Sequence, residues 1–174
     1  MKVLLDIDGV LADFVKGACD LHGARNPYLD EDNLGHYEIQ ELIGISGAAF
    51  WEPMGEEFWA NLPLTSFAKP IADTLINHYG LQNVCLLTSP VRTPGCVRGK
   101  MRWIRKYFPR LARQFLIGPM KEVCAHSNSI LFDDYPGNIE KFKVAGGNTF
   151  LVPAPWNSKA GDHPFHAILA ELIR

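Results

Sequence analysis

The sequence lacks the features that would mark a membrane protein or a bulk nucleic-acid binder. No apolar run approaches the roughly 20 residues that a membrane-spanning helix needs, and the chain does not open on a basic and then apolar leader. We therefore expect a cytoplasmic protein that does not bind membranes. Basic residues are not in excess, because 17 Lys and Arg stand against 19 Asp and Glu. No bulk nucleic-acid binding is expected from such a balance.

Cysteine is scarce, and it is too scattered to form a recognisable motif. The four cysteines, at positions 19, 85, 96 and 124, include no C-x-x-C pair, which argues against a zinc site and against a secreted disulfide framework. A nucleotide-binding P-loop is also missing: the stretch 95–101 is one residue short of G-x-x-x-x-G-K-[ST] and ends in Met101. The six histidines show no i, i+4 pair that would hold a metal.

What the sequence does contain is a series of short apolar runs that end in polar residues. Such runs are typical of strands buried in a parallel sheet. Residues 84–87 precede Thr88 and Ser89, and residues 129–132 precede Asp133 and Asp134. At the start of the chain, an apolar run reaches Ile7 and is interrupted by Asp6 and followed by Asp8 and Gly9. Weaker strands are expected at 115–117 and 149–152, with helices at 67–79, 94–108, 138–145 and 164–173 between or after the strands.

This alternation of strands and helices predicts an α/β fold with a parallel five-stranded sheet. A length of 174 residues suits one such core. Residues 15–64 contain no strand pattern, and we expect helices at 12–23, 30–43 and 46–61, with Ser46 as an N-cap. The predicted organisation is therefore a core formed by residues 1–14 and 65–174, with a helical cap of residues 15–64 inserted after the first strand.

The polar strand ends indicate phosphoryl chemistry. The carboxyl ends of parallel strands share one edge of the sheet, so their polar residues are expected to converge there. Carboxylate oxygens are the ligands that Mg²⁺ prefers, while hydroxyl, amide and ammonium groups can hold a phosphate. The expected site consists of Asp6, Asp8, Thr88, Ser89, Lys100, Asp133 and Asp134.

These residues, in this order, resemble the four motifs of the haloacid dehalogenase-like phosphohydrolases. The resemblance implies a Rossmann-like three-layer sandwich with a helical cap between the first two motifs. It also implies that Asp6 is the nucleophile and Asp8 the general acid and base. Mg²⁺ would be bound directly by the Asp6 side chain, the Asp8 backbone carbonyl and Asp134. Asp133 would support the site without contacting the ion. Thr88, the Ser89 amide and Lys100 would bind the phosphoryl group, and Gly9 would leave room for it.

A narrower resemblance points to the C-type 5'(3')-deoxyribonucleotidases. It rests on Leu11–Phe14 after the first motif, on Thr88-Ser89-Pro90, on the residues that follow Lys100, and on 130–136. In that family aromatic residues of the cap pack on the nucleobase; here the candidates are Phe14, Phe50, Trp51, Phe58 and Trp59. Tyr135 departs from the pattern, since arginine is expected after the acidic pair.

The resulting hypothesis is a Mg²⁺-dependent 5'-nucleotidase acting on a small phosphomonoester. A sugar phosphate or a nucleic-acid end is the alternative substrate, and a non-catalytic module of the same fold is the alternative function. The aromatic residues have a competing interpretation as the core of the cap. The sequence leaves a homodimer open.

Overall fold

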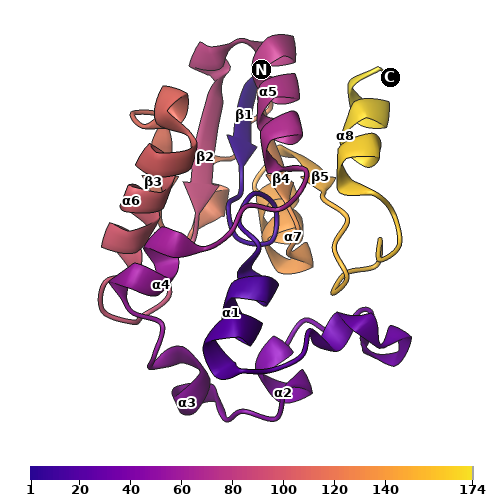
Figure 1. Ribbon diagram of the computed structural model, residues 1–174. Coiled ribbons are helices and arrows are strands. Elements are labelled where there is room, and N and C mark those ends of the chain that lie inside the picture. Colours follow the sequence, from indigo (N-terminus) through magenta and orange to yellow (C-terminus); the bar gives the residue numbers. More distant parts are fainter. Residues whose placement is uncertain (174) are drawn as a thin grey trace.

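The structure, a computed structural model in which residues 1–173 are described, is built on a five-stranded sheet with strand order β3-β2-β1-β4-β5. All neighbouring strands are parallel, and the predicted α/β fold is confirmed (Figure 1). The strands are β1 (Lys2–Leu5), β2 (Val84–Thr88), β3 (Phe115–Ile117), β4 (Ser129–Asp133) and β5 (Asn148–Leu151).

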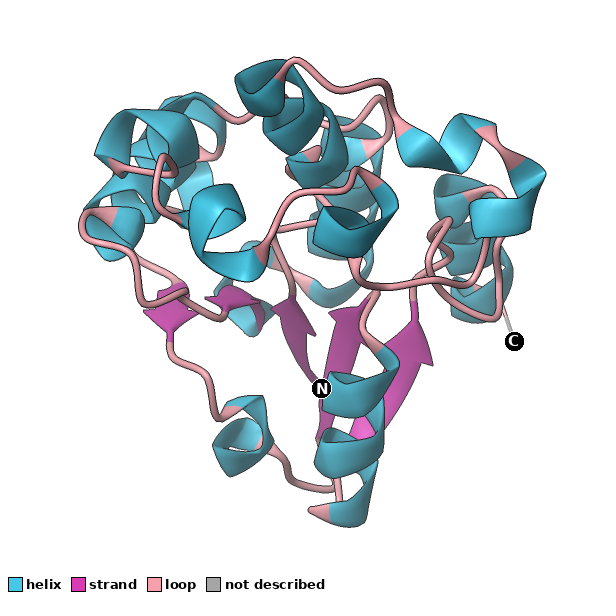
Figure 2. Ribbon diagram, turned by 90° about the horizontal axis from the view of Figure 1, so that it is seen from below, coloured by secondary structure: helices cyan, strands magenta, loops and turns pink. Residues whose placement is uncertain are grey.

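Helices cover both faces of the sheet, as the view in Figure 2 shows. Alternate residues of β1 point to opposite faces: Val3 and Leu5 belong to the larger apolar cluster, whereas Leu4 packs with Phe142 in a smaller one. The larger cluster includes residues of α5 (Ala68–Tyr79) and α6 (Cys96–Tyr107). The smaller cluster lies under α7 (Pro136–Val144), and α8 (Pro164–Leu172) packs against α5. The result is a three-layer sandwich.

The segment that follows β1 forms short helices beyond the arrowheads of the strands in Figure 1, at the carboxyl edge of the sheet. These are α1 (Phe14–His22), α2 (Ile39–Leu42), α3 (Gly47–Trp51) and α4 (Glu56–Asn61). The chain leaves and re-enters the core at adjacent points, because Ala12 forms a bridge with Leu64 and Asp13 N donates to Pro63 O at 2.8 Å. The division into a core and a cap of residues 15–64 remains a prediction.

Two of the helices expected in this segment need correction. Residues 30–43 form a 3₁₀ turn, Glu31–Asn33, and then only the single turn of α2. Asp30 accepts a hydrogen bond from Asp32 N, and Gly35 has a φ of +87°, so the backbone turns instead of continuing as a helix. The helix expected at 46–61 is divided into α3 and α4, because Pro53 and Gly55 lie between them. Ser46 occupies the N-cap position of α3, but its side chain makes no capping hydrogen bond.

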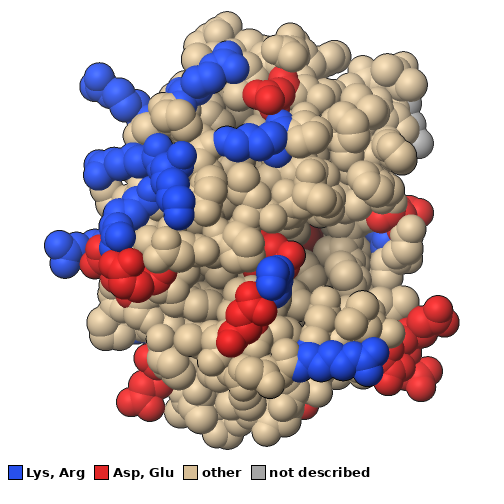
Figure 3. All heavy atoms as spheres, viewed as in Figure 1, with Lys and Arg blue, Asp and Glu red and all other residues tan. Residues whose placement is uncertain are grey.

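The basic residues of α6 gather on one side of the surface in Figure 3. Arg98 and Arg102 form ion pairs with Glu56, and Arg102 also pairs with Glu57 of α4. The basic face of α6 is therefore partly neutralised by the segment that follows β1. Among residues 1–173, no helix combines the length and the apolar character needed to cross a membrane.

Candidate active site

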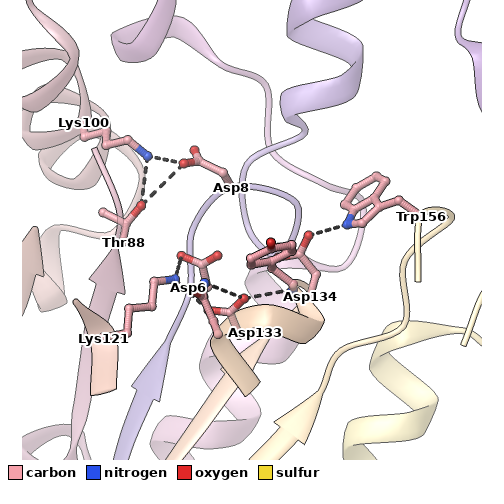
Figure 4. Close-up of polar contacts among 10 residues, drawn as sticks. Asp6, Asp8, Thr88, Lys100, Lys121, Asp133, Asp134 and Trp156 are labelled. Carbon is pink, nitrogen blue, oxygen red and sulfur yellow. Dashed lines mark hydrogen bonds and ion pairs between the residues drawn. The ribbon is translucent and has the colours of Figure 1, made fainter. Parts of the chain in front are cut away.

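Polar side chains from three strand ends meet at the carboxyl edge of the sheet (Figure 4). Asp6 directly follows β1, Thr88 is the last residue of β2, and Asp133 is the last residue of β4. All three are buried, with exposed fractions of 6%, 0% and 0%. The parallel register of the central strands fixes where these ends lie, and the predicted convergence is therefore observed.

One group of contacts surrounds Asp8. Lys100 Nζ forms an ion pair with Asp8 Oδ2 and donates a hydrogen bond to Thr88 Oγ1 at 2.9 Å. Asp8 Oδ1 is buried and accepts no hydrogen bond within residues 1–173. Lys100 is only 2% exposed although it lies on the basic helix α6. It is therefore separated from the solvated charges of that helix and belongs to the site.

A second lysine, which sequence reasoning missed, lies between the other acids. Lys121 Nζ is 2.6 Å from Asp6 Oδ1 and 2.7 Å from Asp133 Oδ2, and Lys121 is 1% exposed. Burial alone would lower the pKa of Lys121, but Asp6 and Asp133 outweigh it and raise the pKa above its usual value. The side chain is thus a permanent cation beside the expected nucleophile.

The two acids of the last motif have different surroundings. Asp133 is saturated: besides Lys121, its carboxylate accepts from Asn138 Nδ2 at 3.0 Å and from Tyr135 N at 2.9 Å. Asp134 Oδ2 accepts from Trp156 Nε1 at 2.6 Å, and Asp134 Oδ1 has no such partner within residues 1–173. Asp134 is therefore the acid with an oxygen to offer to a metal, while Asp133 orients the lysine.

Gly9 is packed against the same carboxylate. It has a φ of +80°, and a Cβ atom there would lie 2.5 Å from Asp134 Oδ2 and 2.7 Å from the Trp156 ring. Only glycine fits this combination of backbone angle and close approach. From the sequence, Gly9 was expected to leave room for a phosphoryl group, but on the side where a Cβ atom would lie Gly9 is packed against Asp134 and Trp156.

The buried carboxylates fit a divalent cation. Oxygen atoms of Asp6, Asp133 and Asp134 lie within 4.8 Å of one another, with Lys121 as the cation that contacts two of them. Burial, together with Asp133 and Asp8, raises the pKa of Asp6 to about 7, against the opposing effect of Lys121. Burial and the neighbouring Asp133 and Asp6 also raise the pKa of Asp134 well above its usual value. When ionised, these three carboxylates outnumber the one lysine that contacts them, and hard oxygen ligands in this number suit Mg²⁺.

Two connected cavities open beside these groups. A cavity of about 160 Å³ exposes Asp6, Asp8, Ser89 and Lys121, and a neighbouring cavity of about 110 Å³ has five aromatic residues among the twelve that line it. Five residues line both cavities: Asp8, Phe14, Tyr37, Trp51 and Asp134. Lys100 does not line the first cavity, whereas Lys121 does. The lysine best placed to meet a bound phosphate is therefore Lys121, and Lys100 holds Asp8 and Thr88.

The aromatic prediction for the pocket is met by only some of its residues. Phe14 and Trp51 line both cavities, and Trp59 lines the first. Phe50 lines neither, because its ring is fully buried, stacked on His22 and in edge contact with Phe14 and Trp51. Phe58 also lines neither and packs edge-on against Trp59. Phe50 and Phe58 therefore belong to the apolar packing of the helical segment, which corrects their expected place in the pocket wall.

Lys121 and Trp156 follow strands of the sheet, as the predicted site residues do, and the position after a strand was the signal that could have identified them. Lys121 comes four residues after the end of β3, and Trp156 comes five residues after the end of β5. Both strands run parallel to the central ones, so their following loops reach the same edge. Asn157 supports this last loop by donating to the carbonyl oxygens of Asp134 and Val152, at 2.9 Å in each case.

Comparison with known proteins gives two related matches. The mitochondrial 5'(3')-deoxyribonucleotidase of Mus musculus is 31% identical over 150 residues, which cover 78% of this chain and 65% of that protein. The mitochondrial 5'(3')-deoxyribonucleotidase of Homo sapiens is 32% identical over 151 residues, covering 78% and 63%. The chain thus spans slightly less than two thirds of the length of these relatives. No family model matches the chain.

Solved structures show a more distant likeness. A HAD family enzyme from Bacteroides thetaiotaomicron, crystallised with magnesium, aligns with a TM-score of 0.48 and 14% identity over 96% of this chain and 97% of that one. CbbY from Rhodobacter sphaeroides, in complex with phosphate, aligns with a TM-score of 0.49 and 14% identity, over 94% and 89%.

The assignment rests on the order of the motifs and on sequence similarity. Asp6 and Asp8, Thr88, a buried lysine and the Asp133-Asp134 pair follow one another along the chain and meet at the carboxyl edge of one parallel sheet. Similarity to the two deoxyribonucleotidases extends over most of the chain. Together these findings support the assignment of the chain to the haloacid dehalogenase-like phosphohydrolase superfamily.

Proposed function

We propose that this protein is a Mg²⁺-dependent phosphomonoesterase that forms an aspartyl-phosphate on Asp6 and acts on nucleoside 5'-monophosphates. The observation that carries the proposal is the meeting of Asp6, Asp8, Lys121 and the Asp133-Asp134 pair beside a cavity with aromatic walls. In this proposal the helical segment 15–64 acts as a cap that supplies part of the substrate pocket.

Asp6 and Asp8 divide the chemistry between them. A carboxylate oxygen of Asp6 attacks phosphorus, the bond from phosphorus to the leaving oxygen breaks, and Asp8 gives a proton to that oxygen. Asp8 then takes a proton from water as the water oxygen attacks phosphorus, and the bond to Asp6 breaks to release phosphate. Lys100 and Thr88 hold Asp8 Oδ2, so Asp8 Oδ1 is the atom left to carry the proton.

The remaining polar groups neutralise and orient the phosphoryl group. Lys121 lines the cavity next to Asp6 and can compensate negative charge on the transferring oxygens, with Ser89 on the same cavity wall. Mg²⁺ would be held by Asp6 and Asp134, with Asp133 holding Lys121 and Asn138 in place, and when bound it supplies further positive charge to the phosphoryl oxygens.

Two features support a nucleotide as the substrate. The aromatic cavity adjoins the acidic one, so a base could stack there while its 5'-phosphate reaches Asp6. The matched relatives are named as deoxyribonucleotidases. At the position where arginine was expected, Tyr135 instead packs against Tyr37 with 4.5 Å between ring centroids, which extends the aromatic surface.

The test is phosphate release with Mg²⁺ from a panel of nucleoside 5'-monophosphates, sugar phosphates and p-nitrophenyl phosphate. Turnover of nucleotides with kcat/KM well above that of sugar phosphates supports the proposal. Hydrolysis of sugar phosphates without nucleotide turnover would leave the chemistry standing and reject the substrate. A loss of all turnover on chelation, restored by Mg²⁺, would support the metal requirement.

A further inference from the structure

The aromatic cavity contains a polar edge that hydrolysis of the phosphate bond does not require. Two polar residues, the exposed Glu38 and the half-buried Gln40, lie at the start of α2 and line this cavity. Neither lines the cavity that exposes Asp6 and Lys121. Their position places them against the part of a substrate that is remote from the phosphate. The aromatic residues around them are Phe14, Tyr28, Tyr37, Trp51 and Trp156.

A carboxylate at this position is unexpected for a pocket that receives an anion. Asp8 and Asp134 already line the cavity, and a phosphomonoester brings further negative charge, so Glu38 opposes binding unless it faces hydrogen-bond donors. The N–H groups of a nucleobase edge are such donors, and the aromatic walls offer flat surfaces on which a base can stack.

Glu38 and Gln40 together present an ordered set of hydrogen-bonding atoms. Gln40 Nε2 donates to Glu38 Oε2 at 3.1 Å, so the amide and the carboxylate lie side by side. A ligand that meets this pair can use the second amide hydrogen of Gln40 as a donor and the two carboxylate oxygens of Glu38 as acceptors, so the pair can present donor, acceptor, acceptor in that order. The complementary row on a base must read acceptor, donor, donor.

We propose that this pair selects guanine, so that guanine nucleoside monophosphates are the preferred substrates; the inference rests on the nucleotidase function proposed above. Guanine presents O6, N1–H and the N2 amino group in the required order, with O6 facing Gln40 and both N–H groups facing Glu38. Uracil and thymine match at the first two positions and place a carbonyl oxygen against the carboxylate at the third. Adenine and cytosine begin with an amino group facing the Gln40 amide and continue with a ring-nitrogen acceptor facing the carboxylate. At the third position cytosine places a carbonyl oxygen against the carboxylate, and adenine has only a C–H group.

The test compares kcat/KM with Mg²⁺ for the 5'-monophosphates of guanosine, uridine, adenosine and cytidine and for their deoxy forms. Guanine is expected to exceed adenine and cytosine by about 10- to 100-fold, which is the discrimination that one or two hydrogen bonds to a partly exposed carboxylate can give. The kcat/KM of the uracil nucleotides is expected to lie between that of the guanine nucleotides and those of the adenine and cytosine nucleotides.

The variant Glu38→Gln makes the prediction specific. With an amide at position 38 the row can read donor, acceptor, donor, which complements uracil and thymine. The ratio of guanine to uracil turnover is therefore expected to fall by about 10-fold or more, while adenine remains poor. The matched control is Glu41→Gln, which removes the same charge from the same helix at an exposed residue that does not line the cavity. In this control variant the ratio of guanine to uracil turnover should equal that of the wild-type protein.

The outcomes separate this inference from the function on which it rests. Equal turnover of all bases, a preference for adenine or cytosine, or an unchanged guanine-to-uracil ratio in Glu38→Gln would overturn guanine selection and leave the nucleotidase function intact. Hydrolysis of p-nitrophenyl phosphate without turnover of any nucleotide would overturn both. A fall in the ratio for Glu41→Gln equal to that for Glu38→Gln would show a general charge effect and would also reject the assignment.

Discussion

The carboxyl edge of the sheet and the helical segment 15–64 meet at the same cavities but are built in different ways. At the sheet edge Asp6, Asp133 and Lys121 are at most 6% exposed and are joined by ion pairs of 2.6 and 2.7 Å. In the helical segment Tyr37 is 47% exposed and belongs to the loop before the single turn of α2. Asp6 and Asp133 are thus held by paired strands and Lys121 by its ion pairs with them, whereas the groups proposed to contact the substrate lie on short elements that can change without disturbing the sheet.

The largest expected effect comes from replacing Asp6, the proposed nucleophile. Asp6→Asn should lower turnover of every phosphomonoester by at least about 10³-fold, because an amide cannot attack phosphorus as a carboxylate does. The fold should survive, since the substitution removes one of three crowded carboxylates. Turnover and thermal unfolding are the two measurements, with Asp20→Asn on the exposed face of α1 as a control. Residual turnover near the wild-type level would remove Asp6 from its proposed role.

The two buried lysines provide the next test. Lys121→Met should lower turnover by about 10²- to 10³-fold, as expected for the loss of one group that stabilises the transition state. Without metal it should also lower the free energy of unfolding by about 3 kcal/mol, because it leaves buried carboxylates without their cation.

Lys100→Met is the matched control for this variant. Its partner Asp8 keeps 26% of its side chain exposed to solvent, so the loss of stability should be smaller. Urea unfolding with and without Mg²⁺ measures the difference, and Mg²⁺ should recover part of the stability of Lys121→Met. Equal losses for the two variants would contradict the distinction drawn between the lysines.

The same contrast between the two regions explains what the sequence could predict. Asp6, Thr88 and Asp133 were found because each follows a buried apolar run, and hydrogen bonding between parallel strands then determines where they meet. The helices expected at 30–43 and 46–61 were wrong because Gly35, Pro53 and the Asp30 turn interrupt a pattern that composition alone does not resolve. Lys121 was missed because it lies four residues beyond the end of β3 instead of directly after the strand.

Removing the hydrogen bond from Trp156 to Asp134 tests whether this bond orients Asp134 for Mg²⁺ binding. Trp156→Phe keeps an aromatic side chain beside Tyr28 but removes the N–H group and the part of the indole that lies against Gly9. The Mg²⁺ concentration for half-maximal turnover should rise by about 10- to 100-fold, which is typical for loss of a group that orients a metal ligand.

At saturating Mg²⁺ the turnover of Trp156→Phe should return close to the wild-type value. Trp103→Phe is the matched control, because the Trp103 N–H donates to Leu62 O at 2.8 Å and contacts no acid of the site. An unchanged Mg²⁺ requirement in Trp156→Phe would show that Asp134 needs no such support.

The smallest expected effect distinguishes a residue that lines the cavities, Trp51, from one that packs inside the helical segment, Phe50. Trp51→Leu should raise KM for nucleotides by about 10-fold, because Trp51 lines both cavities and a stacked base is stabilised by an aromatic face. Phe50→Leu should leave KM for nucleotides within a factor of two or so while lowering the free energy of unfolding by about 1 kcal/mol, since its ring is fully buried. If both variants raised KM equally, the adjacent rings would act as one unit, and the segment could not adjust substrate contacts independently of its own packing.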